Sequence, residues 1–478
     1  MQSSLIEIKR EKNQENLTMN FEPTKTSIRK HEVPDWFQDA KFGIFIHWGL
    51  FSVPGFAVTG LSIIESSKEG EEYHNKNNPY AEWYLNTLKI DGSPTQKYHD
   101  EIFGEKSTYD DFIELFNKGI KDWKPDSWAA LFKKAGARYV ILVTKHHDGF
   151  LLWPSKHKHP VKKNYYASRN IVGELTKEVK NLGLQMGFYY SSSFDWSFNH
   201  EPIIDRLSFM INGVTTPEYT EYVRNHWYEL IDKYEPSILW SDIGAPPLLN
   251  LFELFAYYYN KFPEGVINDR WDKLYHENGK LIKTRRSFFY DFTTPEYETY
   301  DIIKKKKWES SRGIGNSYGY NKMEKEGDYL TSAEIIKILV DIVSKNGNLL
   351  LNVGPMSDGR IPEIQKEVLL GIGEWLEING EGIYGTRPWE RAEGKTLDNI
   401  DIRFTHKNEI LYIHLLNSPI GKTLKILSLK IPQTSTIKLL GYNDPLIWEQ
   451  DQEDLIITIP KNLIDSPVYV FKVIPNEL

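Results

Sequence analysis

The chain has 478 residues, carries a formal net charge of −8 and contains no cysteine. Its length predicts one large domain followed by a smaller one, and the lack of cysteine excludes disulfides, thiolate catalysis and cysteine-bound metals. No basic stripe indicates a nucleic-acid partner, no apolar run of about 20 residues indicates a membrane partner, and the charged N-terminal residues favour a cytoplasmic location over secretion.

Residues 1–32 are predicted to form a polar N-terminal arm, after which strands and helices alternate. Short apolar runs separated by helical patterns are typical of βα units around a parallel sheet. The predicted strands cover residues 42–46, 139–144, 185–190, 237–240, 265–268 and 348–352, and the helices cover 128–134, 173–181, 217–234 and 332–345. This alternation predicts a (β/α)8-type barrel as the catalytic domain, over residues 33–384.

The predicted strands are apolar inside and become polar or aromatic at their C-terminal ends. In a β/α barrel those ends meet on one face, where active sites lie. The pattern therefore predicts an active site that combines residues from several strands. The residues at these ends are His47, His146, His147, Tyr189, Asp242, Arg270 and Asn352.

After about Gly382 the pattern changes to short strands without helices between them. Strands joined only by turns are typical of a β-sandwich. The predicted strands cover 400–405, 410–416, 424–429, 436–440, 455–459 and 468–473. The prediction is an all-β C-terminal sandwich domain over residues 385–478.

Asp242 directly follows the apolar run 238–240. A carboxylate in this position needs partners, because burying it unpaired is costly. It is either an active-site group or a structural residue that caps the next helix or pairs with Arg270. Its place among the other strand-end residues favours the active site.

The sequence His146-His147-Asp148 invites a metal-site interpretation, to which His47 could add a ligand. Further ligands at metal spacing are missing, so hydrogen bonding to sugar hydroxyls is preferred and neither a metal nor a cofactor is predicted. Glu82 and Trp83 place a carboxylate beside an aromatic ring. Either the two side chains pack within an ordinary loop, or the carboxylate binds sugar hydroxyls beside a ring on which the sugar stacks.

Six motifs in order give a more specific indication: FGIFIHWG at 42–49, AEWY at 81–84, KHHDGF at 145–150, LWSD at 239–242, NDRW at 268–271 and LLNVGP at 350–355. Together they resemble the retaining α-L-fucosidases of glycoside hydrolase family 29. The resemblance covers about residues 33–384, and the predicted sandwich also fits this family.

The resemblance implies a function and a role for individual residues. Asp242 would be the nucleophile of a retaining glycosidase that cleaves terminal α-L-fucosyl linkages in a fucosylated oligosaccharide or glycoside. Glu296 would be the general acid/base, although residues 272–286 resemble an insertion, and Glu298 and Glu309 lie close enough in sequence to compete. The implied sugar-binding residues are His47, Glu82, Trp83, His146, His147, Tyr189, Trp240, Arg270 and Tyr318.

Other functions stay open at this point. One is a glycosidase for a related sugar such as an α-L-galactoside, which differs from a fucoside at the C5 substituent. A second is a fucose-binding barrel without catalysis, and a third is a metal-dependent hydrolase that uses the histidines and Asp148. The sequence leaves open whether the chain forms a homo-oligomer.

Overall fold

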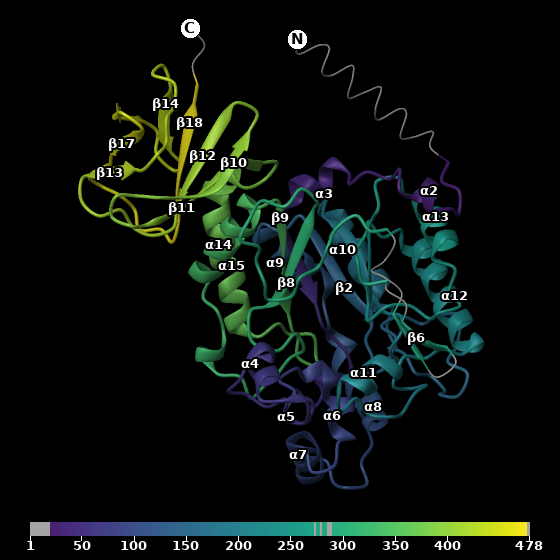
Figure 1. Cartoon of the computed structure of the whole chain (residues 1–478). Coiled ribbons are helices and arrows are strands. Elements are labelled where there is room, and N and C mark those ends of the chain that lie inside the picture. Colours follow the sequence, from purple (N-terminus) through teal and green to yellow (C-terminus); the bar gives the residue numbers. More distant parts are fainter. Residues whose placement is uncertain (1–19, 272–273, 278–279, 284–288, 476–478) are drawn as a thin grey trace.

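The computed structural model describes residues 20–271, 274–277, 280–283 and 289–475. Strands surrounded by helices form one part of the molecule, and a purely β part is attached beside two of those helices (Figure 1). The β part contains the C-terminal residues, shown in yellow-green in the same view.

The centre of the larger part is a sheet of seven parallel strands in the order β5-β4-β3-β2-β1-β9-β8. Strands β1, β2, β4 and β9 are buried at every position, because helices cover the outer face and side chains fill the inside. The strand bounds are β1 Phe42–Ile46, β2 Tyr139–Lys145, β3 Gln185–Ser191, β4 Ile238–Asp242, β5 Val266–Ile267, β8 Trp308–Gly313 and β9 Gly347–Val353.

An irregular segment, residues 291–297, connects the two edge strands of this sheet. The Asp291 backbone N–H donates to Ile267 at the end of β5 over 2.9 Å, and Thr293 accepts from Glu309 of β8 over 2.8 Å. Tyr297 donates to Ser311 of β8 over 2.9 Å. The segment thus occupies the place of an eighth strand, and the predicted (β/α)8-type architecture is confirmed.

Helices follow most of the strands, and several of them begin at a side-chain cap. Thr216 caps α12 by accepting from the Tyr219 N–H, and Thr331 forms a capping box with Glu334 at the start of α14. The barrel helices are α9 Pro125–Lys134, α10 Ile171–Asn181, α12 Pro217–Tyr234, α13 Leu251–Lys261, α14 Ser332–Ser344 and α15 Glu363–Asn379.

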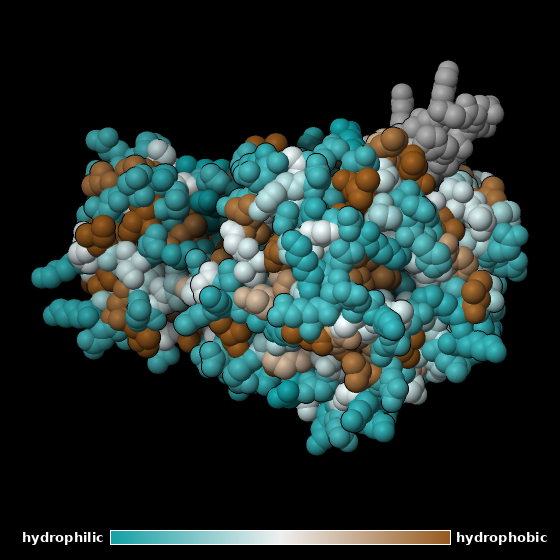
Figure 2. All heavy atoms as spheres, turned by 90° about the horizontal axis from the view of Figure 1, so that it is seen from below, coloured by the Kyte–Doolittle hydropathy of each residue, from teal (hydrophilic) through white to brown (hydrophobic). Residues whose placement is uncertain are grey.

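Shorter helices lie on the face where the strands end. They are α4 Ile63–Lys68, α5 Glu71–Lys76, α6 Tyr84–Leu88, α7 Pro94–Ile102, α8 Phe112–Gly119 and α11 Arg206–Ile211. They gather at the lower end of the molecule in Figure 1. Seen from that end, the surface is mostly hydrophilic, with hydrophobic residues scattered over it (Figure 2).

The predicted insertion at 272–286 contains a hairpin of β6 (Leu274–Glu277) and β7 (Lys280–Lys283). The remaining residues of that prediction lie outside the described part of the chain. The described end of the predicted N-terminal arm is packed on the barrel. It contains α2 (Lys25–Ile28), followed by α3 (Asp35–Ala40). Phe21 and Ile28 are buried, and the Phe21 N–H donates to Asn260 Oδ1 over 2.7 Å.

The C-terminal part has two antiparallel sheets whose apolar faces enclose a separate core. Their orders are β10-β11-β12-β18-β14-β15 and β13-β17-β16, which confirms the predicted sandwich. The bounds are β10 Arg387–Lys395, β11 Asp401–Lys407, β12 Ile410–Leu415, β13 Thr423–Ile426, β14 Thr436–Leu439, β15 Pro445–Leu446, β16 Trp448–Asp451, β17 Asp454–Thr458 and β18 Tyr469–Ile474. The boundary at residue 385 stays a prediction.

In the described residues, no helix is long and apolar enough to cross a membrane.

Candidate active site

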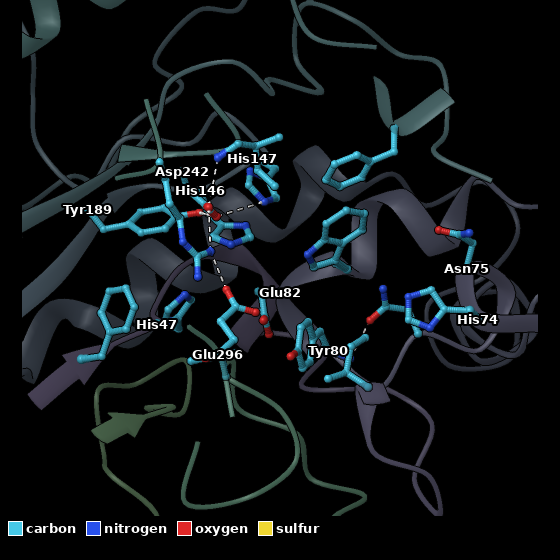
Figure 3. A pocket seen from close by; sticks show the side chains of 18 of the residues that line it. His47, His74, Asn75, Tyr80, Glu82, His146, His147, Tyr189, Asp242 and Glu296 are labelled. Atoms are coloured by element: carbon cyan, nitrogen blue, oxygen red, sulfur yellow. Dashed lines mark hydrogen bonds and ion pairs between the residues drawn. The ribbon is translucent and has the colours of Figure 1, made fainter. Parts of the chain in front are cut away.

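A cavity of about 720 Å³ opens where the barrel strands end. Side chains from strands β1, β3 and β4, from segment 291–297 and from the loops and short helices that follow β1, β2, β3, β5 and β8 line it. Figure 3 shows carboxylates, imidazoles and aromatic rings pointing into it. All the residues to which the family resemblance assigns a role lie on its wall: His47, Glu82, Trp83, His146, His147, Tyr189, Trp240, Asp242, Arg270, Glu296 and Tyr318. Asn352, also predicted from its place at a strand end, does not line the cavity and instead bonds His47.

Asp242 is the last residue of β4, and its carboxylate is held on several sides. Oδ2 accepts from the Tyr189 hydroxyl over 2.8 Å, and Oδ1 accepts from Arg270 Nη1 over 3.1 Å and from the Ile243 N–H over 3.0 Å. His147 Nε2 lies 3.9 Å from Oδ2. These donors compensate the ionised carboxylate for its burial and fix its direction into the cavity.

The turn after Asp242 is strained. Ile243 has a φ of 53°, in the left-handed region that a β-branched residue rarely adopts. The conformation allows the Ile243 N–H to donate back to the carboxylate that precedes it, while the Gly244 N–H donates to the Arg270 carbonyl over 3.1 Å. Strain of this kind persists where the surrounding structure enforces it, commonly at functional sites.

Arg270 joins the two predicted catalytic carboxylates. Its Nη1 donates to Asp242 Oδ1 and to Glu296 Oε1, while Nε and Nη2 donate to the Thr294 hydroxyl and carbonyl, each over 2.8 Å. The guanidinium lies 4.7 Å above the centre of the Trp240 ring. Burial opposes the charge, but the nearby Glu296 and Asp242 raise the pKa of Arg270, so it stays a fixed cation.

The three glutamates that compete for the acid/base role have different positions. Glu296 lies on the cavity wall and contacts Arg270, whereas Glu298 lines the cavity but is exposed to solvent. Glu309 is fully buried inside the barrel, where it accepts from the Tyr139 hydroxyl over 2.6 Å and from Trp240 Nε1 over 3.1 Å. Burial raises its pKa to about 7. It does not line the cavity.

The three histidines form a neutral wall. His47 Nδ1 bonds Asn352 Oδ1 over 2.7 Å, and His147 Nδ1 bonds the Ser191 hydroxyl over 2.6 Å. Burial lowers the pKa of both to about 3 and lowers that of His146 well below its usual range. Neutral rings can exchange hydrogen bonds with hydroxyl groups of a ligand without adding charge.

Asp148 does not join these histidines. Its Oδ2 accepts from the Tyr109 hydroxyl over 2.8 Å and its Oδ1 from the Phe150 N–H over 3.1 Å, behind the cavity wall. The described residues contain no group of three or more His, Asp or Glu placed to hold a metal ion. Asp148 and the histidines, which the metal-dependent alternative requires together, therefore do not face the same cavity.

Glu82 is a buried carboxyl group that also lines the cavity. Its Oε2 accepts from the Gly319 N–H over 2.7 Å, and burial raises its pKa to about 8. Below that pH the protonated form prevails, so the group can donate a hydrogen bond as well as accept one. The adjacent Trp83 ring is half-buried and meets the His147 ring edge-on, with 5.5 Å between the ring centres.

Tyr189, Trp240 and Tyr318 form an aromatic lining next to the carboxylates. The Tyr189 and Trp240 rings stack at 5.4 Å, and the Tyr318 ring lies 4.9 Å from that of His47. The Tyr318 hydroxyl is 3.2 Å from that of Ser311. The lining gives the cavity flat apolar surfaces beside its polar groups, a combination that suits a sugar ring.

Several lining residues were not predicted. Phe45 is in β1 and lies two residues before His47, so the alternation of side chains along a strand already placed both on the same side of the sheet. Tyr80 directly precedes the AEWY motif and lies two residues before Glu82. The residues on or directly before the short helices had no signal, because their sequences carry no recognisable pattern: Ile63, Glu71, His74, Asn75, Asp205, Arg206 and Phe209.

Comparison with known proteins agrees with this geometry. A family model described as Alpha-L-fucosidase matches residues 8–381, and one described as Alpha-L-fucosidase C-terminal domain matches residues 396–473. The chain is 34% identical over 469 residues to an α-L-fucosidase of Dictyostelium discoideum, covering 91% of this chain and 93% of that one. It is 32% identical to the tissue α-L-fucosidase of Mus musculus over 458 residues, covering 92% and 91%.

Among solved structures, the α-fucosidase of Thermotoga maritima in complex with a mechanism-based inhibitor is 42% identical, with a TM-score of 0.85. The match covers 95% of this chain and 100% of that one. The complex of the same enzyme with fucose has a TM-score of 0.83 at the same identity and coverage. The two family models and these full-length matches show that the chain belongs to the α-L-fucosidase family of glycoside hydrolases.

Proposed function

We propose that the protein hydrolyses terminal α-L-fucosyl linkages with retention of configuration, through a covalent fucosyl intermediate on Asp242. The observation that carries this proposal is the carboxylate pair bridged by Arg270. Its Nη1 lies 3.1 Å from Asp242 Oδ1 and 2.5 Å from Glu296 Oε1, so these two oxygens are no farther apart than the sum of those distances. Carboxyl groups lie about 5–5.5 Å apart in retaining glycosidases and about 6.5–9.5 Å apart in inverting ones.

In the first step, Asp242 attacks the anomeric carbon of fucose while the bond to the glycosidic oxygen breaks. Glu296 exchanges its contact with Arg270 for one with that oxygen and transfers its proton to it, so the leaving group departs as an alcohol. Arg270 and Tyr189 orient the Asp242 carboxylate for this attack.

In the second step, the roles of Glu296 reverse. The glutamate, now ionised, removes a proton from a water molecule, whose oxygen attacks the anomeric carbon and releases Asp242. Two inversions at the same carbon give net retention, and Glu296 ends with its proton restored.

The neutral histidines and Glu82 are proposed to bind the ring hydroxyls, and Tyr318 to flank the C5 methyl group. Such contacts raise turnover only where they become stronger as the ring flattens in the transition state. An apolar pocket discriminates a methyl from a hydroxymethyl group only modestly, so activity on α-L-galactosides remains a second prediction. The cytoplasmic location and possible homo-oligomer also stay predictions.

The test is the variant Asp242→Gly with an aryl α-L-fucoside as substrate. We expect hydrolysis to fall by at least about 10³-fold, because the covalent step is lost, with the thermal unfolding temperature little changed. Added azide should restore turnover and yield the β-fucosyl azide, of inverted configuration. Asp301→Gly, at an exposed position, is the matched control. Activity near that of the unmodified protein in Asp242→Gly would remove the assignment.

A further inference from the structure

The N-terminal arm reaches the segment that carries Glu296. Helix α2 of the arm lies beside α13 of the barrel (Figure 1). Just after α2, His31 is only 9% exposed and packs its ring on that of Tyr259 in α13, with 3.8 Å between the ring centres. The same ring contacts Asp291, the first residue of segment 291–297. A residue of the arm is thus in direct contact with a segment that lines the active site.

Both ring nitrogens of His31 face oxygen atoms that accept hydrogen bonds. Nδ1 lies 2.8 Å from Asp291 Oδ1, and Nε2 lies 2.9 Å from the Pro263 carbonyl oxygen. A neutral imidazole has a proton on one nitrogen only, so it would donate to one of these oxygens and turn a lone pair to the other. The imidazolium donates to both. The arrangement therefore fits the charged form of His31.

Asp291 is surrounded by donors, as the ionised form of a carboxyl group requires. Its Oδ2 accepts from the Tyr259 hydroxyl over 2.9 Å and from the Ile267 N–H over 2.7 Å, while Oδ1 faces His31. The side chains of His31 and Asp291 are 3% and 1% exposed. They form a buried ion pair, and such a pair is costly to break because the remaining charge loses its partner.

Ionisable groups act on His31 from several elements. Burial by itself lowers its pKa, but the charge and hydrogen bond of Asp291, together with Glu264 after α13, outweigh burial and raise it. Burial raises the pKa of Tyr258 and Tyr259, both in α13, well above the usual range, so these two stay neutral. His31 therefore keeps its charge at pH 6.5, where an unperturbed imidazole is half protonated.

Segment 291–297 depends on such contacts because it is not a regular strand. In the part of the chain that the structure describes, isolated ladder contacts connect it to its neighbours. At its start, the Asp291 N–H donates to the Ile267 carbonyl of β5 over 2.9 Å, and the Ile267 N–H donates to the Asp291 side chain. A side chain thus takes the place of a backbone acceptor in the ladder. Its orientation, which His31 fixes, sets the register of the segment.

The far end of the segment carries the chemistry. Five residues after Asp291, roughly 16 Å along an extended chain, Glu296 lines the cavity. Between them, Thr294 accepts from Arg270 with its hydroxyl and its carbonyl. A shift at the start of the segment would therefore displace Glu296 and disturb Arg270. Asp242 would be affected less, because two of its donors lie outside the segment.

We propose that His31 is a positioning residue for the acid/base step: its imidazolium, paired with Asp291, holds segment 291–297 in the register that places Glu296 beside Asp242. This inference rests on the proposed function and adds the N-terminal arm to it. His31 does not touch the substrate. It acts through Asp291, and its effect is confined to the proton transfers that Glu296 performs.

The first test uses the variant His31→Gln, which removes the charge and reaches only one of the two acceptors. We expect kcat/KM on phenyl α-L-fucoside to fall about tenfold more than on the activated dinitrophenyl α-L-fucoside. The reason is that only the poor leaving group needs the proton of Glu296, and general acid catalysis contributes about 10²–10⁴-fold. Inhibition by free fucose should change little, because the predicted sugar-binding residues lie on other elements.

Two further variants control this experiment. Lys30→Gln removes a positive charge from an exposed position of the same arm and should leave both substrates unaffected. Tyr259→Phe is milder than His31→Gln, because it keeps the ring that stacks on His31 and removes only one donor to Asp291. It should show the same dependence on the leaving group at a smaller size, and it serves as the test variant where His31→Gln does not fold.

The second test needs no substrate and measures the charge of His31. The unmodified protein should have a higher thermal unfolding temperature than His31→Gln, and the difference should be full below pH 6.5. It should shrink as the pH rises through the raised pKa of His31, because the neutral ring gives up one of its two hydrogen bonds. The difference between the unmodified protein and Lys30→Gln should not vary in this way.

The outcomes separate the two proposals. Equal losses on both fucosides in His31→Gln, or in Tyr259→Phe, would overturn the positioning role and leave the fucosidase proposal intact. A difference in unfolding temperature that does not change with pH would overturn the charged pair. An unmodified protein that hydrolyses neither fucoside would overturn the proposed function and the positioning role with it, whereas the unfolding temperatures would still report on the pair of His31 and Asp291.

Discussion

Arg270 gives the two carboxylates of the site different surroundings. Asp242 also receives hydrogen bonds from Tyr189 and from the Ile243 N–H, whereas Arg270 is the only donor to the Glu296 side chain found in the described residues. The Glu296 side chain is 38% exposed and that of Asp242 only 12%. A carboxylate with several fixed donors suits a nucleophile that must stay in place. A carboxylate with one exchangeable contact suits a group that must gain and lose a proton.

This difference predicts how the variant Glu296→Ala behaves. We expect a loss of about 10²–10⁴-fold in kcat/KM on substrates whose leaving group needs a proton, such as fucosyl disaccharides, because general acid catalysis contributes that much. Activated aryl fucosides should lose much less in the first step, since their leaving groups depart without protonation. Steady-state kinetics on both substrate types measures the contrast.

Glu298→Ala is the matched control, because Glu298 also lines the cavity but is exposed. It should retain activity on both substrates. A uniform loss in Glu296→Ala, together with a leaving-group-dependent loss in Glu298→Ala, would transfer the acid/base role to Glu298.

At the scale of elements, a buried ion pair supports the loop after β2 that carries the histidines. Lys145 Nζ lies 2.7 Å from Asp195 Oδ2, both side chains are inaccessible to solvent, and Nζ also donates to the Tyr219 hydroxyl over 3.1 Å. The next residue along from Asp195, Trp196, donates its N–H to the His147 carbonyl over 2.7 Å. The pair therefore joins the loops after β2 and β3 directly behind the cavity.

The variant Asp195→Asn should be destabilised by about 3–5 kcal/mol, because it leaves the Lys145 ammonium buried without its counter-charge. The double variant Lys145→Met with Asp195→Asn removes that uncompensated charge and should recover part of the lost stability. Chemical denaturation measures the free energy of unfolding of each protein. The pair is not coupled in this way if the double variant loses as much unfolding free energy as the single variants Asp195→Asn and Lys145→Met lose together.

At the scale of the whole molecule, the sandwich is packed against the helices of the barrel. Trp375 of α15 donates from Nε1 to the Val468 carbonyl over 3.0 Å, and Val468, Val470 and Tyr412 belong to the same apolar core as the barrel. Arg403 of β11 donates to Asp341 of α14 over 2.6 Å. An interface with a shared apolar core predicts that the two parts unfold together.

The variant Trp375→Ala tests this coupling. We expect a loss of about 3–5 kcal/mol, because a large buried ring is removed and a buried carbonyl loses its donor. Scanning calorimetry of the unmodified protein should show one transition, which in the variant moves to lower temperature or separates into two. Two transitions in the unmodified protein, with only one of them shifted by the substitution, would contradict a shared core.

Local patterns in the sequence were enough to predict the barrel strands β1 to β5 and β9, because a strand buried on both faces is a continuous apolar run. They did not reveal β8, whose sequence is WESSRG. There the inward Glu309 is tolerated because Tyr139 and Trp240, from other strands, satisfy its carboxylate. Segment 291–297 was also missed, because it occupies the place of a strand with only isolated ladder contacts.

The chain by itself determined which face of the barrel carries the chemistry and that Asp242 lies there, because the C-terminal ends of parallel strands must meet. Only the tertiary structure decided which glutamate faces Asp242. Glu296 and Glu309 lie 13 positions apart on neighbouring backbone segments, but the Glu296 side chain lines the cavity and the Glu309 side chain is buried inside the barrel. The part of the cavity lined by α5 and α11 likewise depends on two helices that are far apart in sequence and have no motif. Their contact comes from packing, which no local pattern encodes.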